Sequence, residues 1–419
     1  MRGYSDYFVG LDIGTRTVRA AVCASEPGGT ELTLLGLGEV PSEGMNRGVV
    51  VDISAAKNAV RRAIEAAEVD AGVEVESALV GIAGSHIRSL NSSGIVAIKG
   101  TEITPNDVRR CVEAAKDNAL PSDRRIIHAL PQDFKVDDHI GVREPVGMSG
   151  KRLEAQVHVV SVSVNAANNV VKSVKAAGFE VEDVILDPLA SAAAVLDDDE
   201  RQLGVCVADL GSGTTDLAVY REGALIHSRV LPLGGESLTK AISAALLTPF
   251  SEAERVKVEA GAACAHLVEP DDWMQIGSVG GRASRKVDVL SVARIIEEQM
   301  SSLFDAILAE LESNHLTQHL GGGVVITGGG AQMRGMAELA ERILGLPVRR
   351  GTVSGVSGIP RHLRSESLAT VLGLCLFGKS QSGDPLRSAR RHRMGDGDQT
   401  GLFKITKRLM DFFSGYGEA

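Results

Sequence analysis

Two short segments of the sequence carry residues that can hold the phosphates of a nucleotide. In each, an aspartate follows an apolar run and leads into a turn of small and hydroxyl-bearing residues. Small residues let a phosphate approach backbone N–H groups, hydroxyls add donors, and a carboxylate can hold a magnesium ion through water. The first segment is Asp12 with Gly14, Thr15, Arg16 and Thr17, and the second is Asp209 with Gly211, Ser212, Gly213, Thr214 and Thr215. The pattern predicts two phosphate loops that face each other, with Asp12 and Asp209 beside the metal.

A third segment, Gly328 to Gly330, follows the short apolar run 324–326. Bare backbone at a helix N-terminus leaves room for a flat ribose and base, and Met333 is expected at the same pocket. Taken alone, each aspartate turn is equally typical of a tight β-hairpin, but the three segments in this order favour a nucleotide site. Neither aspartate turn contains the GxxxxGK[ST] pattern of a P-loop, and a dinucleotide-binding turn must open a helix rather than join two strands.

The elements that must position the two loops form a repeat. Residues 8–23 predict two buried strands joined by a polar glycine turn. Aligning Asp12 with Asp209 places Gly14 on Gly211 and apolar residues on apolar residues. This self-similarity indicates a two-fold repeated architecture.

Between the two copies, residues 85–159 are predicted to form an inserted α+β module. Thr104 and Pro105 supply an N-cap and a first-turn proline for a helix with its apolar residues on one face. Around it, 87–98 and 153–164 alternate apolar and polar residues, as half-buried strands do.

After the second copy, residues 227–302 are predicted to form a second subdomain. Apolar periodicity predicts helices over 238–247, 252–263 and 287–311, and another that opens at the glycines of 328–330 and ends at Gly345.

Composition narrows the class of protein. The chain has 419 residues, 44% of them hydrophobic, and a formal net charge of -10, with a sequence pI near 5.6. It can therefore bury a large core, and its charge repels phosphate backbones, so we expect no nucleic-acid partner. Five scattered cysteines predict free thiols in a reducing compartment. Because neither a secretory signal nor a long apolar span occurs, we expect the protein to remain in the cytoplasm.

The C-terminal region predicts a membrane-binding helix on a tether. Residues 379–400 are rich in Ser, Gly, Asp and Arg, which is typical of a flexible linker. On a helical wheel of the following segment, apolar residues share one half and basic residues the other, as in helices that lie in the interface of anionic membranes. A helix docked on the protein's own core is the alternative. The proposed membrane-binding residues are Leu402, Phe403, Lys404, Ile405, Lys407, Arg408, Leu409, Met410, Phe412 and Phe413.

Across residues 7–378, these segments resemble the actin superfamily, which includes actin, the heat-shock chaperones and the sugar kinases. The resemblance implies that ATP and Mg²⁺ bind between the loops. The family often begins its first connecting helix with Glu-Pro, whose glutamate places the attacking water; here the pair is Asp187 and Pro188. Asp187 is thus the candidate catalytic residue, and its shorter side chain implies at most weak ATPase activity; alternatively, it is a helix N-cap. Glu254 and Lys257 match a pair that contacts ribose and base, or else form an ordinary solvated helix pair.

Four further stretches look like signatures of the FtsA family of bacterial cell-division proteins. They are GIAGSHIR at 81–88, IIHALPQ at 126–132, EPVGMSGKRL at 144–153 and DPLASAAAVL at 187–196. The resemblance implies a protein that polymerises and binds the C-terminal tail of FtsZ, the tubulin-like division protein, through 227–302. It also implies recruitment of other division proteins and peripheral attachment to anionic lipids on the cytoplasmic face of the inner membrane, at the division site.

The expected fold class is therefore α/β: an actin-like two-lobed ATPase fold with an inserted α+β subdomain and a C-terminal amphipathic helix. The first lobe is expected from 1–84 and 160–200, the inserted subdomain from 85–159, the second lobe from 201–226 and 303–378, its small subdomain from 227–302, the linker from 379–400 and the membrane helix from 401–419.

Two other functions share these loops. A small-molecule kinase of the sugar-kinase branch would need a substrate pocket with a general-base aspartate, for which the sequence offers no motif. An actin-like pilus-assembly scaffold would need no lipid-seeking tail. His86 and His128 invite a catalytic role, but histidines in half-buried strands are usually packed and hydrogen-bonded.

Overall fold

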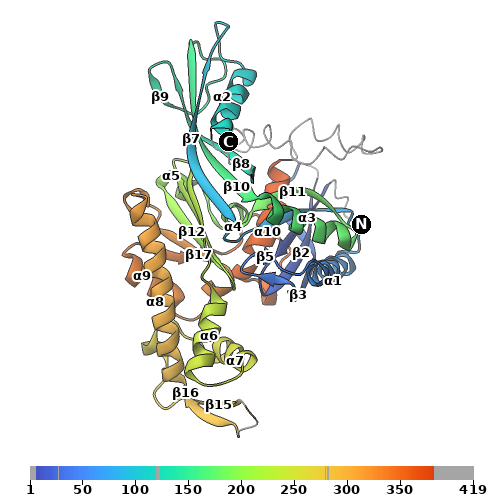
Figure 1. Ribbon diagram of the computed structural model, residues 1–419, viewed down its shortest axis with the longest axis vertical. Helices are drawn as coiled ribbons and strands as arrows, with labels where there is room; N and C mark the ends of the chain where they lie inside the picture. The colour runs from blue at the N-terminus through green and yellow to red at the C-terminus, as the bar shows by residue number, and fades with distance from the viewer. Residues whose placement is uncertain (1–5, 27, 119–122, 279, 281–282, 382–419) are drawn as a thin grey trace.

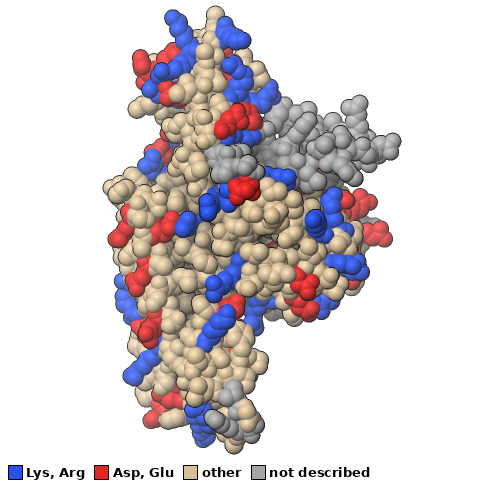
Figure 2. Space-filling model, in the orientation of Figure 1, with Lys and Arg blue, Asp and Glu red and all other residues tan. Residues whose placement is uncertain are grey.

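The computed structural model describes residues 6–26, 28–118, 123–278, 280 and 283–381. The predicted amphipathic helix and nearly all of the predicted linker lie outside the described residues. The described chain forms two α/β lobes, with an inserted module at one end of the molecule and a small subdomain at the other (Figure 1). Acidic and basic side chains are interspersed over the face seen in Figure 2.

The first lobe is built on a six-stranded sheet of order β11-β6-β1-β2-β3-β19. Three antiparallel strands form its centre: β1 (Asp6–Ile13), β2 (Thr17–Ser25) and β3 (Leu32–Pro41). The parallel strands β6 (Ser77–Ile82) and β11 (Glu180–Leu186) continue beyond β1, while β19 (Val356–Ser357) pairs with β3. Further elements are β4 (Met45–Asn46), β5 (Val49–Val50), α1 (Ile53–Ala71) and α3 (Val164–Ala177).

Helix α1 covers this sheet closely. Asp52 caps its N-terminus by accepting from Ser54 N and Ala55 N, and the helix ends at Gly72, which has φ of +68°. A Cβ on Gly38 of β3 would lie 1.9 Å from the carbonyl oxygen of Ala63. Glycine is therefore what allows the helix to approach the strand.

The second lobe repeats the same sheet, as the sequence repeat predicts. Its order is β14-β13-β12-β17-β18, with an antiparallel meander followed by two parallel strands. The two aspartate turns also match: Gly14 N donates to Thr17 O at 3.1 Å, and Gly211 N donates to Thr214 O at 3.0 Å. The strands are β12 (Val205–Leu210), β13 (Thr215–Arg221), β14 (Ala224–Leu231), β17 (Val324–Thr327) and β18 (Val348–Arg350).

Two helices join the lobes at the centre of the molecule (Figure 1). Helix α4 (Asp187–Val195) packs on β12 and β13, and α10 (Ala369–Ser380) packs on α4 and on β1, β2 and β6. Gly373 permits the contact between α10 and α4, because a Cβ there would lie 1.9 Å from Ala190 O.

The other short elements around the two lobes are α5 (Asp198–Leu203), η2 (Thr317–His319), η4 (Arg361–Leu363) and η5 (Glu366–Leu368).

The placement of α10 corrects two expectations. Residues 303–378 were expected in the second lobe, but β19 and α10 belong to the sheet and core of the first lobe. The chain returns there because Val371, Leu372 and Cys375 fill the apolar face left open by β1 and β2. The linker was expected to begin at Lys379, but α10 continues to Ser380 and Gln381 is buried.

The inserted module is a four-stranded sheet backed by one helix. Its own core contains Val108, Cys111 and Val112 of α2, as predicted. Thr104 and Asp107 form a capping box, which is why the helix begins at Pro105. The sheet order is β7-β10-β8-β9, and the elements are β7 (Ile87–Ala97), α2 (Pro105–Asp117), β8 (Arg124–Val136), β9 (His139–Val142) and β10 (Arg152–Ser163).

The small subdomain of the second lobe contains the predicted helices with shifted ends. Val287 lies in a strand rather than a helix, and α7 stops at Ala260 instead of Ala263. Its elements are α6 (Gly235–Ala245), α7 (Phe250–Ala260), η1 (Ala265–Leu267), β15 (Trp273–Ile276), β16 (Arg285–Asp288) and the start of α8 (Val289–Ser313).

The helix expected directly after the glycine segment is divided in two. A short turn, η3 (Gly329–Gln332), comes first, and α9 (Met336–Leu344) follows after Gly335, which has φ of +79°. The break has a cause, since Ala263 N donates to Arg334 O at 2.8 Å in a strand-like bridge. Met333 therefore lies outside α9, while Gly345 ends α9 as predicted.

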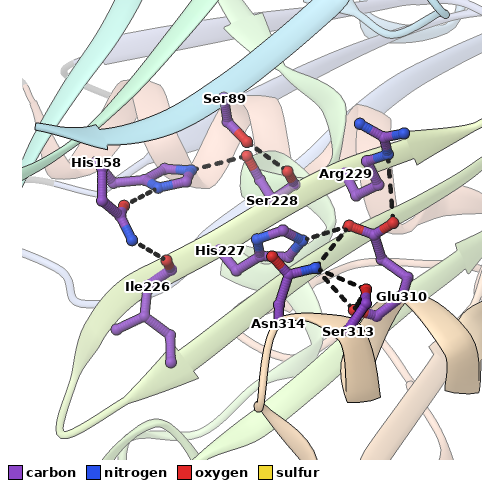
Figure 3. Close-up of polar contacts among 10 residues, drawn as sticks. Ser89, His158, Ile226, His227, Ser228, Arg229, Glu310, Ser313 and Asn314 are labelled. Carbon is purple, nitrogen blue, oxygen red and sulfur yellow. Dashed lines mark hydrogen bonds and ion pairs between the residues drawn. The ribbon is translucent and has the colours of Figure 1, made fainter.

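A polar seam, buried at His158 and Ser228, joins the inserted module to edge strand β14 of the second lobe (Figure 3). Ser89 Oγ donates to Ser228 O at 2.5 Å, and Asn91 Nδ2 donates to Ile226 O at 3.1 Å. His158 uses both ring nitrogens: Nδ1 lies 2.7 Å from Asn91 Oδ1, and Nε2 lies 2.9 Å from Ser228 Oγ. Because Asn91 Oδ1 can only accept, Nδ1 carries the proton and Nε2 accepts from the serine.

We expect His158→Leu to destabilise the protein by about 1–3 kcal/mol, because it removes the hydrogen bond to Asn91 and leaves the buried hydroxyl of Ser228 without its ring acceptor. Burial lowers the pKa of His158 to about 3 from 6.5, so the seam's contribution is present above pH 6.5 and is lost as the pH falls. Urea unfolding at pH 7.5 measures the change. His139→Leu, on the exposed strand β9, is the control, and equal losses in the two variants would contradict the seam's role.

Candidate functional site

A cavity of about 1120 Å³ lies between the two lobes, and residues from both line it. The first phosphate loop enters it from the β1–β2 turn and the second from the β12–β13 turn. The glycine segment after β17 and helix α7 complete the walls. Every residue predicted to bind nucleotide or metal, or to act in catalysis, lines this one cavity: Asp12, Gly14, Thr15, Arg16, Thr17, Asp187, Asp209, Gly211, Ser212, Gly213, Thr214, Thr215, Glu254, Lys257, Gly328, Gly329, Gly330 and Met333.

The two phosphate loops touch each other at the bottom of the cleft. A Cβ on Gly213 would lie 2.4 Å from Thr15 Oγ1 and 2.8 Å from Arg47 Cα. Thr15 Oγ1 is itself fixed, because it accepts from Gly48 N at 3.1 Å. Glycine at position 213 is therefore required for the loops to meet, and their backbone N–H groups border the same space.

The glycine segment presents bare backbone to the cavity. Gly328 has φ of +80°, and a Cβ on it would lie 2.2 Å from Asp209 Oδ1. A Cβ on Gly329, in contrast, would meet no described atom within 4 Å. The segment is held from behind, since Gly328 N donates to Glu366 O at 3.1 Å. Gly328 therefore serves the fold, and Gly329 borders the space available to a ligand.

Four aspartates gather at the closed end of the cavity. Asp12, Asp209 and Asp216 are buried, and Asp187 is half-buried with its Oδ1 enclosed. Burial raises the pKa of Asp12 to about 6, against the opposing effect of Arg19 and with a further rise from Asp209. Burial, followed by the charges of the other aspartates, also raises the pKa values of Asp187 and Asp216 well above their usual range.

The hydrogen bonds of this carboxylate cluster are incomplete. Asp209 Oδ2 accepts from Ser191 Oγ at 2.5 Å and from Thr370 Oγ1 at 3.0 Å. Asp187 Oδ1 and Asp216 Oδ1 are buried with no hydrogen-bond partner among the described residues. Such a cluster favours a cation, which would offset the mutual repulsion of the carboxylates. Within the described ranges, no three of these carboxylates come within direct-ligand distance of one another, so the geometry suits a hydrated ion.

Two details of this cluster differ from the sequence reading. Asp187 does not cap α4, because Leu186 occupies the N-cap position and no side chain caps the helix. Its carboxylate instead lies against Gly81 of β6, where a Cβ would be 2.3 Å from Asp187 Oδ1. Asp216 was not predicted as a site residue. The register of the β12–β13 hairpin could have identified it. Asp216 pairs with Asp209 across the two strands, so both side chains lie on the same side of the sheet.

Glu254 and Lys257 form a buried pair, not the solvated helix pair that was the alternative. Their side chains are 10% and 12% exposed, and Lys257 Nζ lies 2.8 Å from the Glu254 carboxylate. Burial opposes ionisation of Glu254, but hydrogen bonds from Lys257 and Thr239 outweigh it and lower its pKa. Arg16, from the opposite lobe, approaches the same carboxylate at 3.0 Å.

The histidines and cysteines have the structural environments expected of packed residues. His128 is buried, and its Nε2 accepts from Leu186 N at 3.0 Å, while burial lowers its pKa to about 3. His86 is packed as predicted but not hydrogen-bonded, since neither ring nitrogen has a partner among the described residues. All five cysteines are free thiols, as expected. No helix in the described part of the chain is long and apolar enough to span a membrane.

Comparisons with known proteins agree on a family. Residues 206–373 match the family model "Cell division protein FtsA", and residues 84–161 match "SHS2 domain inserted in FTSA". The chain is 44% identical to the cell division protein FtsA of Pseudomonas aeruginosa over 376 residues, covering 90% of each protein. It is 39% identical to the FtsA of Neisseria meningitidis, and the match covers 97% of this chain and 98% of that protein. It is 37% identical to the FtsA of Escherichia coli, with 88% of this chain and 90% of that protein covered.

Solved structures confirm the actin-like fold. A PilM–PilN type IV pilus biogenesis complex matches with a TM-score of 0.63 and 19% identity over 90% of this chain and 99% of that one. MreB5 of Spiroplasma citri bound to ADP matches with a TM-score of 0.54 and 16% identity, and the match covers 90% of this chain and 97% of that one. At these identities the likeness concerns the fold alone.

We expect Gly329→Ala to weaken ATP binding at least tenfold while leaving the melting temperature of the ligand-free protein unchanged. The added methyl group meets no described atom within 4 Å but occupies the wall where a ribose or base would pack. Titration calorimetry and thermal unfolding measure the two quantities. Gly100→Ala, in the inserted module, is the matched control because its Cβ makes only ordinary contacts. Unchanged affinity in Gly329→Ala would show that the nucleoside does not rest there.

We expect Asp12→Asn to stabilise the ligand-free protein at pH 7 but not at pH 4. The folded-state pKa of about 6 lies above the ordinary value of 3.8, so the folded protein holds this proton more tightly. The contribution of Asp12 to stability is therefore greatest below pH 3.8 and falls by up to about 1.4 kcal/mol per pH unit as the pH rises toward 6. Unfolding midpoints across this range measure the effect. A variant less stable than the parent at pH 7 would contradict it.

Proposed function

Because the chain belongs to the FtsA family of bacterial cell division proteins, we propose that it binds ATP between its lobes, polymerises, and anchors FtsZ filaments to the membrane. The observation that carries the proposal is the pair of facing phosphate loops above a cluster of buried carboxylates. The filament would lie on the cytoplasmic face of the inner membrane at the division site, where other division proteins are recruited.

The carboxylate cluster fits a magnesium ion bound with the nucleotide. Asp12 and Asp209 would hold its water ligands, with Asp216 beside them, and the backbone of the two loops would hold the phosphates. A bound divalent cation would supply the positive charge that lets these carboxylates ionise together. Ser191 and Thr370 keep Asp209 oriented toward the site from α4 and α10.

Asp187 is the candidate for positioning an attacking water. Its enclosed Oδ1 has no partner among the described residues, so it can accept a hydrogen bond from a water molecule. An aspartate reaches about one carbon–carbon bond less far than a glutamate. This shorter reach supports an ATPase that is weak at most.

The small subdomain of the second lobe is the proposed docking site for the FtsZ tail. Family membership is the main support, and exposed apolar side chains add to it: Leu247, Phe250 and Trp273 are 64%, 44% and 55% exposed. Exposed large apolar groups in a protein with few aromatics are typical of contact surfaces.

Membrane attachment is proposed to depend on the segment 402–413, which lies outside the described residues. One amphipathic helix of this length buries only part of its apolar face, so its binding is reversible. Assembly of many subunits on one bilayer would multiply weak contacts into firm attachment. ATP-linked polymerisation and membrane binding are therefore proposed to be coupled. A pilus scaffold shares the fold, but the identities of 37–44% are to division proteins.

We expect the full chain, with Mg²⁺ and ATP, to float with vesicles that contain anionic lipid, and a variant lacking 401–419 to stay in the soluble fraction. Both proteins should bind ATP equally, since every residue proposed to bind the nucleotide or its metal lies between positions 12 and 333. Replacing Lys404, Lys407 and Arg408 with alanine should weaken binding to anionic vesicles more than to neutral ones. Equal flotation of the deletion variant and the parent would contradict membrane anchoring by this segment.

A further inference from the structure

An ion pair crosses the cavity between the lobes. Arg16 lies in the first phosphate loop, in the turn between β1 and β2, and Glu254 lies on α7 in the second lobe. Arg16 Nη1 is 3.0 Å from Glu254 Oε1, and both residues line the cavity. A cation on a phosphate-binding turn thus occupies a carboxylate oxygen on the wall of the nucleotide cavity.

The two oxygens of Glu254 have different partners. Oε2 accepts from Thr239 Oγ1 at 2.5 Å and pairs with Lys257 Nζ at 2.8 Å, both from the same subdomain. Lys257 also donates to Thr239 Oγ1 at 2.9 Å and to Gly235 O at 3.2 Å, so this half is fixed. Oε1 faces Arg16. It is the oxygen that remains for a ribose hydroxyl, once Arg16 leaves it.

Arg16 is the most exposed member of this group. Its side chain is 52% exposed, compared with 10% for Glu254 and 12% for Lys257. An ion pair with one solvent-exposed partner is weak, so the guanidinium can turn away at small cost. A triphosphate carries more negative charge than one carboxylate, and the planar guanidinium forms paired hydrogen bonds with phosphate oxygens.

We propose that Arg16 exchanges partners when the nucleotide binds. Without ligand it pairs with Glu254 Oε1; when phosphates occupy the space between the loops, it turns to them and releases Oε1 to accept from a ribose hydroxyl. This inference rests on the proposed ATP site. Arg16 is then a specificity-determining residue, because it favours ligands that carry phosphates and competes with those that carry only the nucleoside.

The test is whether one substitution changes the affinities for two ligands in opposite directions. In the full chain, Arg16→Ala should weaken Mg²⁺-ATP binding about tenfold, the order expected for a lost charge-assisted hydrogen bond. The same variant should bind adenosine about threefold more tightly, because Oε1 no longer has a competing partner. Titration calorimetry measures ATP, and ligand-observed NMR measures adenosine. Arg16→Lys should keep part of the ATP affinity, since it keeps the charge without the planar fork.

Lys240→Ala is the matched control, because it removes a cation from α6 that pairs with Glu236 and does not line the cavity. It should leave both affinities unchanged. If Arg16→Ala changes the affinities for ATP and adenosine in the same direction, or changes neither affinity, the proposed exchange is overturned while the ATP site stands. If the parent binds neither ligand, the proposed ATP site fails, and the exchange fails with it.

Discussion

The structure depends on the cost of keeping several carboxylates together away from water. Asp12, Asp187, Asp209 and Asp216 repel one another at the closed end of the cavity, and two of their oxygens have no partner among the described residues. In the ligand-free protein this repulsion is relieved by protonation, as the raised pKa of Asp12 indicates. A magnesium-bound triphosphate would relieve it more fully, so binding of the nucleotide would stabilise the folded protein.

The fold brings these charges together by duplication. Each lobe has the same meander and the same turn after an aspartate, so the two loops meet with their small residues facing. Helices α4 and α10 lie between the sheets and supply the hydroxyls that orient Asp209. Since α10 returns to the first lobe, the last described helix fastens the lobes around the site. The inserted module adds a further link through the seam at His158.

Local patterns predicted much of this arrangement, and long-range contacts set the rest. The repeat, the site residues on the cavity wall and helix α2 follow from glycines, hydroxyls and apolar spacing near each other in sequence. The return of α10 to the first lobe did not, because the apolar composition of this helix does not indicate which lobe it packs against. Asp216 and the break before α9 depend on cross-strand register and on a bridge to Arg334, which periodicity does not reveal.

The most direct test of the central claim is the number of protons released when the protein binds magnesium-saturated ATP at pH 6. Titration calorimetry in two buffers of different ionisation enthalpy gives this number. The raised pKa of Asp12 means that the ligand-free protein holds part of a proton on this group at pH 6. The cation favours the ionised carboxylates, so its binding releases protons to the buffer. We predict release of about half a proton to one proton per ATP. Binding of ATP with no proton release at this pH would contradict the account.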